Sequence, residues 1–333
     1  MRATAHRDVA VVVPACNAAA TIERALGSAL DQPEVAEVVL VDDGSDDGTA
    51  QRARFADDGS GRLRIIAQPN AGPSAAVNRG QAATRAPFFC VLDADDFFLP
   101  GRLEAIFEAA GDDWDLAADR PLILTEGQEA GPFERWTGEI PASGELTFAA
   151  FVEGNISRPD RPGAELGFLQ PVFRRAFLED RGLRHDEAVR LGEDYLLYAA
   201  ALAAGARFRV VADAGYVIVR RAASLSQRHS VADLAALLAA DRRLLQHPSL
   251  SAADREVLRR HIAHVHRKLQ YRRALEAKKH HRWREAAAAV CADFGVLGYV
   301  LSETARARLG ARTDFESLPR ASSPRACRRL TRA

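Results

Sequence analysis

The alternation of short apolar runs with amphipathic segments over the first hundred residues constrains the fold of this chain most. Runs such as Val9–Val13 are typical of strands buried on both faces of a sheet, and helical patterns with one apolar face separate them. Thr21 is the predicted N-cap of the first helix. The predicted strands cover 9–13, 35–41, 63–67 and 88–92, and the predicted helices cover 22–30, 48–55 and 73–83. This order predicts an α/β fold with a doubly wound, mainly parallel sheet flanked by helices.

The later part of the chain divides into three regions by composition. Residues 112–171 are rich in Gly and Pro, which predicts loops, short strands and one helix near Thr147–Val152. A helix over Tyr195–Ala204 and strands over 207–212 and 216–220 follow. Leu-, Ala- and Arg-rich helices are then predicted over 231–246, 251–277 and 282–308. We therefore predict a domain over 1–228, with a nucleotide-binding half (1–110) and an acceptor half (111–228), a helical extension over 229–310 and a disordered tail over 311–333.

Charge and cysteine usage are compatible with a cytoplasmic protein. Lys plus Arg and Asp plus Glu number 45 each, so the net charge selects no partner. The four cysteines are scattered without metal-binding spacing, which argues against a disulfide framework. The apolar run Val9–Pro14 is too short for a signal segment, and no run reaches 18 apolar residues. These features predict a soluble protein, or one that touches the inner face of the cytoplasmic membrane peripherally.

Polar residues follow three of the predicted strands. Ligands of open parallel sheets bind beyond the carboxyl ends of the strands. These ends carry Pro14–Asn17, Asp42–Ser45 and Asp93–Asp96. Carboxylates repel one another unless a cation or hydrogen-bond donors offset their charge, so a charged ligand is expected there. Asp46, Asp47 and Gly48 are instead interpreted as turn and cap residues.

The triplet Asp93-Ala94-Asp95 is the strongest candidate for a metal site. Two carboxylates separated by one residue can face a single hard cation, which can in turn hold phosphate oxygens. The three-residue pattern is weak alone. Its position directly after a buried strand, and before Phe97–Pro100, which is predicted to start a new helix, strengthens it. Asp95 is the first choice for the metal, Asp93 the helper and Asp96 a neighbour.

Four segments in succession resemble the family 2 glycosyltransferases with the GT-A fold, and together they cover about residues 8–105. They read VVVPACNAAATIERAL, VVLVDDGSDDGT, QPNAGPSAAVNRG and FFCVLDADDFFLPGRL. The resemblance implies a divalent cation, Mn²⁺ or Mg²⁺, held by Asp95 and Asp93 against the diphosphate of a nucleotide-sugar. It also implies that Asp43 reads the uracil of a UDP donor. The donor-binding residues it implies are Pro14, Asn17, Asp43, Asn78, Arg79 and Asp93.

One residue departs from the family pattern. Cys16 stands where the family usually has Tyr, which puts stacking of this side chain on the base in doubt. We interpret Cys16 as a small packing residue.

The segment Gly192-Glu193-Asp194 resembles the family's acidic pair at a helix start near the acceptor. A sugar hydroxyl is a poor nucleophile, so a carboxylate must accept its proton during attack, and a helix N-terminus keeps a carboxylate ionised. The predicted base is Asp194; an ordinary acidic cap is the alternative. Glu193 and Gln170 are the expected acceptor-binding residues. His229 is either a third metal ligand or a solvated loop residue.

The segment from Gly167 to Arg220, with SLSQRHS after it, is similar to bacterial exopolysaccharide glucosyltransferases of the succinoglycan type. This implies transfer of a hexose, with glucose expected, from a UDP-sugar to a polyprenyl-diphosphate-linked oligosaccharide. The basic stretch 255–284 is either a solvated helix or a surface for anionic headgroups or the acceptor's diphosphate. No motif accompanies it that would indicate nucleic-acid binding.

The sequence therefore predicts an inverting, metal-dependent glycosyltransferase. A nucleotidylyltransferase would need a Gly-rich, basic N-terminal loop, which Pro14–Ala20 lacks. A non-catalytic UDP-sugar-binding or scaffold protein stays possible, although such a protein has no need of both Asp95 and Asp194.

Overall fold

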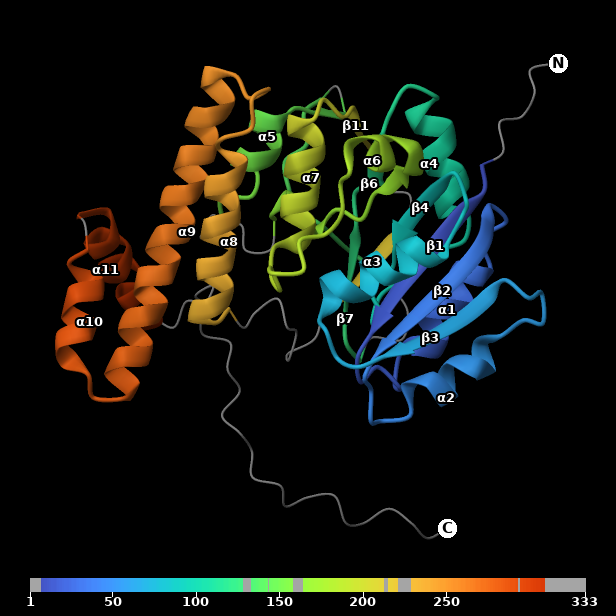
Figure 1. Ribbon diagram of the computed structural model, residues 1–333, viewed down its shortest axis with the longest axis horizontal. Coiled ribbons are helices and arrows are strands. Elements are labelled where there is room, and N and C mark those ends of the chain that lie inside the picture. The colour runs from blue at the N-terminus through green and yellow to red at the C-terminus, as the bar shows by residue number, and fades with distance from the viewer. Residues whose placement is uncertain are drawn as a thin grey trace, which may run out of the picture.

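The computed structural model describes residues 7–127, 133–142, 144–157, 164–212, 215–220, 229–292 and 294–308. Its main sheet has the strand order β3-β2-β1-β4-β10-β6-β11-β9 (Figure 1). The strands of this sheet are β1 (Val9–Ala15), β2 (Val35–Asp43), β3 (Leu63–Gln68), β4 (Phe88–Val91), β6 (Leu116–Asp119), β9 (Glu145–Leu146), β10 (Val172–Arg174) and β11 (Phe208–Val211). The four strands predicted from the first hundred residues are all present.

The sheet is mixed but mainly parallel. β3, β2, β1 and β4 run parallel to one another, and β6 runs parallel to β11. β10 enters antiparallel between β4 and β6, and β9 closes the edge antiparallel to β11. The predicted α/β fold is therefore confirmed, with β10 joining β4 to β6.

Helices cover both faces of the sheet because successive residues of each strand point to opposite sides. Val11 and Val13 of β1 pack with the helices α1 and α4, whereas Val12 packs with Val77 of α3. The helices that precede the C-terminal extension are α1 (Ile22–Leu30), α2 (Thr49–Ala53), α3 (Pro73–Ala83), α4 (Arg102–Ala110), α5 (Phe148–Glu153), α6 (Arg175–Arg181) and α7 (Glu193–Ala203). Thr21 occupies the N-cap position of α1, but its side chain makes no capping hydrogen bond. It donates to the Ala18 carbonyl instead.

A second, smaller sheet has the order β5-β12-β7-β8. Its strands are β5 (Phe97–Phe98), β7 (Leu122–Thr125), β8 (Glu134–Arg135) and β12 (Tyr216–Arg220). The prediction that Phe97–Pro100 starts a helix is wrong: Phe97 and Phe98 pair antiparallel with Val217 and Tyr216, and α4 begins only at Arg102. A two-residue strand whose partner lies far along the chain has no local sequence signal.

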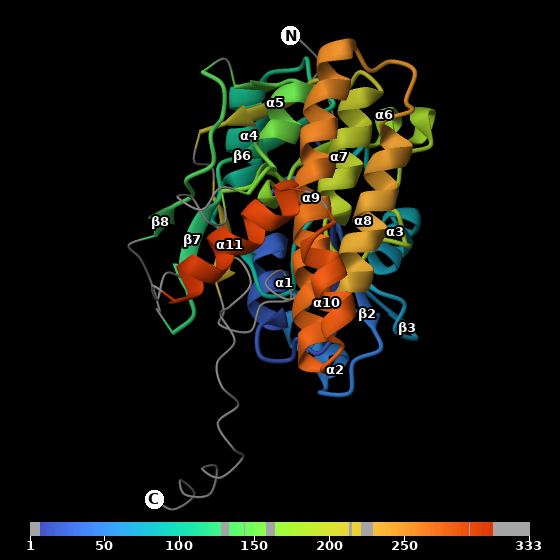
Figure 2. The ribbon, with the colours of Figure 1, turned by 90° about the vertical axis from the view of Figure 1, so that its left-hand side faces the viewer.

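Of the C-terminal helices, the first two pack against the side of the molecule that carries α5 and α7, and the last two pack on the second (Figures 1 and 2). They are α8 (Val231–Leu244), α9 (Ala252–Lys279), α10 (Trp283–Val290) and α11 (Phe294–Arg308). Ala240, Leu250 and Leu258 belong to the same apolar core as the β6 and α7 side chains. The helix predicted over 282–308 is in fact two helices, α10 and α11.

In the part of the chain that the structure describes, no single helix has the length and hydropathy to cross a bilayer. Helix α10 and residues Gly295–Glu303 have the required length and hydropathy only when they are taken together, and this pair is bent by 111°. The boundary at residue 228 stays a prediction, and the predicted tail over 311–333 lies outside the described residues.

A buried ion pair ties α4 to both sheets. Arg102 is fully buried, and its Nε and Nη2 donate to one carboxylate oxygen of Asp119 at 3.0 and 2.7 Å. Arg102 also donates to the Gln170 carbonyl, and its guanidinium lies 5.0 Å from the ring centre of Tyr216. The second oxygen of Asp119 accepts the backbone N–H groups of Gly215 and Tyr216. This pair therefore fixes the start of β12, which is needed to position the acidic loop after β4.

Removing this arginine should destabilise the protein strongly. Arg102→Leu leaves the Asp119 carboxylate buried without its cation, so we expect unfolding free energy to fall by about 3 kcal/mol or more in urea titrations. Arg209→Leu is the control, because the Arg209–Glu145 pair is exposed and is expected to contribute less than about 1 kcal/mol. Equal losses in the two variants would contradict this role of Arg102.

Candidate active site

The three strand ends that carry polar residues are neighbours. β1 lies between β2 and β4, and both pairs are parallel. Ala15 is in register with Asp42, and the Leu92 N–H continues the ladder to the Val12 carbonyl. The segments after the three strands therefore leave the sheet at the same edge, as the sequence predicted.

The loops after β1 and β2 are bonded to each other. Asn17 adopts a φ of 55°, a left-handed conformation that Asn tolerates better than most residues. Its backbone N–H donates to Ser45 Oγ, and its side-chain oxygen accepts the Asp46 N–H, both at 2.9 Å. Asp47 bonds to Thr49 and to the Ala19 N–H, in keeping with its interpretation as a turn residue. The structure thus gives Asn17 a loop-holding contact, and donor binding by Asn17 stays a prediction.

Asp43 holds the loop between β3 and α3. One carboxylate oxygen accepts from Gln68 Nε2 and the Ala71 N–H at 2.8 Å, and the other accepts the Gly72 N–H at 2.9 Å. Gly44 is required next to it, since its φ is 77° and a Cβ would lie 2.9 Å from the Asn70 nitrogen. Asn70 in turn donates to Cys16 Sγ. Asp43 therefore shapes the loop, while its contact with uracil and the role of Pro14 beside it stay predictions.

Side chains of β12 and α1 anchor the loop that carries Asp93 and Asp95. Tyr216 of β12 donates its hydroxyl to Asp96 at 3.0 Å and accepts the Asp93 N–H at 3.3 Å. The second oxygen of Asp96 accepts the Val219 N–H. On the other side, Arg24 of α1 donates to the Asp95 carbonyl at 2.7 Å. Asp96 is thus the anchor of the loop.

Asp93, Asp95 and Asp96 come together with Glu193 and Asp194, and we call these five residues the acidic cluster. Burial raises the pKa of Asp93 well above its usual value, and the charges of the other four members raise it further. Burial, and then the charge of Asp95, raise the pKa of Asp96 to about 7. Burial and Asp194 raise the pKa of Glu193 to about 8. The fold therefore gathers acidic side chains at the end of β4 and the start of α7.

Asp194 stands at the N-terminus of α7. Gly192 is the N-cap with a φ of 80°, so Glu193 and Asp194 are the first two residues of the helix. The free N–H groups and dipole at this end favour a negative charge. Asp194 Oδ1 lies 3.0 Å from Nε2 of His185, and the Asp194 side chain keeps 27% of its surface exposed. A partly exposed carboxylate at this position can accept a proton from a bound hydroxyl.

Asn78, a predicted donor contact, bonds to the acceptor half. Its side-chain oxygen accepts the His185 N–H at 3.1 Å, and its amide donates to the His185 carbonyl at 3.0 Å. The amide also lies 2.9 Å from a carboxylate oxygen of Glu187. Arg79 donates to Gln68, and both α3 residues line a hollow of about 560 Å³ beside the β3–α3 loop. Donor binding by Asn78 and Arg79 stays a prediction.

The contacts of two further predicted residues, Gln170 and His229, do not assign them a role. Gln170 is buried, and its side-chain oxygen has no hydrogen-bond partner among the described residues, so it can still accept a bond from a ligand. His229 precedes the Ser230 cap of α8 and is half-buried. Within the described ranges, no three His, Cys, Asp or Glu side chains form a metal-binding group. Metal binding by His229 and acceptor binding by Glu193 and Gln170 stay predictions.

The acidic cluster is chemically suited to a divalent cation. Its donors are carboxylate oxygens, which Mn²⁺ and Mg²⁺ prefer over nitrogen or sulfur. Burial, and then repulsion from the neighbouring carboxylates, raise the pKa values of Asp93 and Asp96. A cation beside Asp93 and Asp95 would lower this repulsion, so these residues fit the predicted cofactor.

Three residues of the site were missed from the sequence: His185, Tyr216 and Arg24. His185 lies nine residues before Asp194, and a lone loop histidine carries no specific signal. Tyr216 and Arg24 act from β12 and α1, and only the tertiary fold brings them to the acidic loop.

The comparison with protein families agrees with this geometry. The chain matches the model of Glycosyl transferase family 2 over residues 10–176, which includes β1 to β4 and the acidic loop. The protein is a family 2 glycosyltransferase. This glycosyltransferase is similar to the succinoglycan biosynthesis protein ExoU of Rhizobium meliloti (strain 1021), with 46% identity over 279 residues, 84% of this chain and 81% of ExoU. ExoO of the same strain is 38% identical over 261 residues, 77% of this chain and 73% of ExoO.

Solved structures show the same fold at low identity. S. aureus TarS 1-349 in complex with UDP-GlcNAc superposes with a TM-score of 0.62 and 21% identity, covering 91% of this chain and 87% of TarS 1-349. The mannosyltransferase PcManGT from Pyrobaculum calidifontis, in complex with GDP-Man and Mn²⁺, gives a TM-score of 0.55 and 17% identity, covering 90% and 80% of the two chains. The glycosyltransferase thus has the predicted GT-A fold, extended by α8 to α11.

Proposed function

We propose that this glycosyltransferase moves glucose from UDP-glucose to a saccharide acceptor with inversion, and that the acceptor is a lipid-linked oligosaccharide of exopolysaccharide biosynthesis. The observation that carries the proposal is the meeting of Asp93 and Asp95 with Asp194 in one acidic cluster. The names of ExoU and ExoO support an exopolysaccharide product. The complex of TarS with UDP-GlcNAc supports a uridine donor.

The reaction is a single in-line displacement. The oxygen of an acceptor hydroxyl forms a bond to the anomeric carbon, and the bond from that carbon to the diphosphate oxygen breaks. UDP leaves with the electron pair. The hydroxyl proton moves to the exposed part of the Asp194 carboxylate, since Oδ1 is engaged by His185. Attack from the face opposite to UDP turns an α-linked donor into a β-linked product.

The ends of the strands hold the donor in this scheme. Asp43 keeps the β3–α3 loop in shape for the nucleobase, and the anchored loop after β4 presents Asp93 and Asp95 to the diphosphate. A divalent cation bound by these two acids would offset the charge that develops on the leaving UDP. Tyr216 and Arg24 hold this loop in place through bonds to its backbone, so Asp93 and Asp95 would keep their positions when a cation binds.

Replacing the proposed base should separate catalysis from donor binding. Asp194→Asn keeps the size of the side chain but removes the proton acceptor, so UDP release from UDP-glucose with Mn²⁺ should slow by roughly 100-fold or more. UDP affinity, measured by calorimetry with Mn²⁺, should change less than about threefold, because Asp194 does not contact the diphosphate. A variant that releases UDP at the wild-type rate would refute the assignment of the base.

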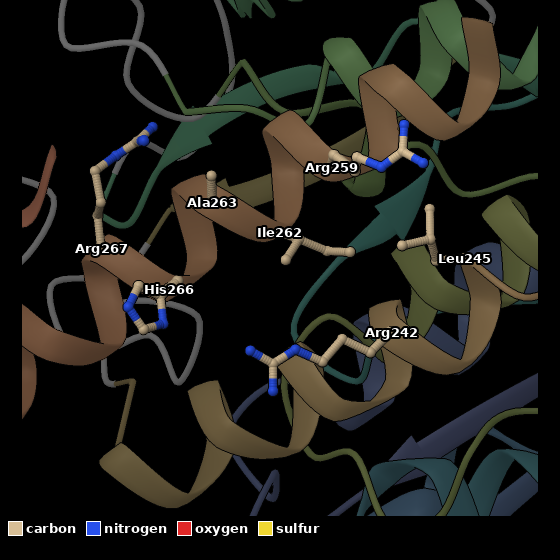
Figure 3. Close-up of a pocket in the computed structure, with 7 residues that line it drawn as sticks. All are labelled: Arg242, Leu245, Arg259, Ile262, Ala263, His266 and Arg267. Carbon is tan, nitrogen blue, oxygen red and sulfur yellow. The ribbon is translucent and has the colours of Figure 1, made fainter. Parts of the chain in front are cut away.

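We also propose that the extension contacts an anionic membrane surface, which is consistent with a cytoplasmic protein acting on a lipid-linked acceptor. A groove of about 410 Å³ lies between α8 and α9 and is lined by Arg242, Arg259, Arg267 and His266 around Leu245, Ile262 and Ala263. Figure 3 shows Arg242, His266 and Ile262 directed into the space between the two helices. Trp283 and Leu301, on the neighbouring α10 and α11, are exposed by 59% and 63%. The basic groups of the groove and the exposed apolar residues elsewhere in the extension are the kinds of side chain that suit a headgroup layer.

Vesicle binding should depend on the charge of this groove. Arg242→Glu with Arg267→Glu should weaken co-sedimentation with phosphatidylglycerol-containing vesicles by roughly tenfold or more, since each arginine near such a surface contributes about 1 kcal/mol. Arg52→Glu with Arg54→Glu, at the C-terminal end of α2, makes the same change of net charge elsewhere and should bind like wild type. Equal binding by both double variants would contradict the proposed surface.

A further inference from the structure

The segment between α6 and α7 is fastened to the donor half of the molecule. Besides the paired bonds between Asn78 and the backbone of His185, Ser74 of α3 donates its hydroxyl to the Val189 carbonyl at 3.0 Å. The partners lie more than a hundred residues apart in sequence. Two side chains of one helix thus fix the backbone just before Glu193 and Asp194. The position of the acceptor-side acids is therefore set partly by the helix that follows the β3–α3 loop.

His185 transmits this constraint to Asp194. Its side chain is 1% exposed, and Nε2 lies 3.0 Å from Asp194 Oδ1. Nδ1 is also buried and has no hydrogen-bond partner among the described residues. A proton on Nδ1 would leave a buried donor unpaired, at a cost of about 1–3 kcal/mol. The neutral tautomer with its proton on Nε2 suits this environment, so His185 donates one hydrogen bond to Asp194.

We propose that His185 is a positioning residue for Asp194 and that Asn78 holds it in place. The Nε2–H of His185 occupies Oδ1 and fixes the plane of the carboxylate, which leaves Oδ2 turned toward the acceptor hydroxyl. The proton taken from that hydroxyl stays on Asp194. His185 does not pass it on, because its Nε2 already carries a proton and its Nδ1 has no hydrogen-bond partner among the described residues. This role rests on the proposed function of Asp194 as the base. It adds a second task to Asn78, which links the donor helix α3 to the base.

Two amide variants of different reach test the proposal. In His185→Gln the Nε2–H group can occupy nearly the position of the imidazole Nε2–H, whereas the shorter side chain of His185→Asn cannot reach Asp194. The kcat of UDP release from UDP-glucose with Mn²⁺ should fall by roughly 10- to 100-fold in His185→Asn, the scale on which misplaced catalytic groups slow enzymes. It should stay within about threefold of wild type in His185→Gln. The KM for UDP-glucose should change little in both, which distinguishes positioning from donor binding.

A neighbouring residue supplies the control. Asp186 lies on the same segment and pairs with Arg243 at 2.6 Å, while its other oxygen accepts the Ala188 N–H. Asp186→Asn keeps that acceptor and leaves the His185–Asp194 bond intact, so its kcat should match wild type. Thermal unfolding of all variants separates loss of structure from loss of positioning. If His185→Asn does not fold, Asn78→Ala provides the same test, with a lower kcat expected at saturating UDP-glucose; its KM is not compared, because Asn78 is also a predicted donor contact.

The outcomes are distinct. Equal kcat values for His185→Gln and His185→Asn, whether both normal or both low, would overturn the positioning role. If Asp194→Asn itself releases UDP at the wild-type rate, the proposed base fails, whatever the His185 variants do. A slow Asp194→Asn together with a fully active His185→Asn would leave the base in place and reject His185.

Discussion

Electrostatic repulsion within the acidic cluster is the constraint on which the rest of the site depends. Burial raises the pKa values of Asp93 and Asp96 at the end of β4 and of Glu193 at the start of α7, and the negative charges of neighbouring members of the cluster raise them further. Such crowding costs free energy that folding must offset elsewhere. The offset comes from fixed donors: Tyr216 and the Val219 N–H on Asp96, His185 on Asp194, and the N-terminus of α7. A cation would offset the carboxylate charge that these donors leave uncompensated.

The acids of the site divide into two groups by their contacts. Asp43, Asp47, Asp96 and Asp119 accept backbone N–H groups and hold loops or strands in place. Asp194 instead shares one oxygen with His185 and keeps part of its surface exposed. The loop-holding acids set the positions of the others, because Asp96 anchors the loop of Asp93 and Asp95, and Asp119 with Arg102 anchors the strand that carries Tyr216. The positions of Asp93 and Asp95, the predicted metal-binding acids, thus depend on Asp96 and Asp119, which are assigned no chemical role.

Much of the fold was predictable because its signals are local. Apolar runs such as Val9–Val13 mark buried strands, and parallel strands bring their carboxyl ends to one edge. The contacts of Asn78 and His185 were not predictable, since they join helices and loops separated by over a hundred residues. The same holds for Phe97–Phe98, which become a strand only because Tyr216 and Val217 lie beside them. Family resemblance assigned Asn78 to the donor, whereas the structure adds its bonds to the backbone of His185 in the segment before α7.

The most direct test of the account is the metal dependence of UDP binding. Calorimetric titration of UDP into the wild-type protein should give an affinity roughly tenfold or more higher with Mn²⁺ than with a chelator, a difference of about 1.4 kcal/mol or more. Asp95→Ala should lose this difference, whereas Asp47→Asn, which changes only loop contacts to Thr49 and Ala19, should keep it. The account would be contradicted if wild-type protein bound UDP equally well with and without Mn²⁺.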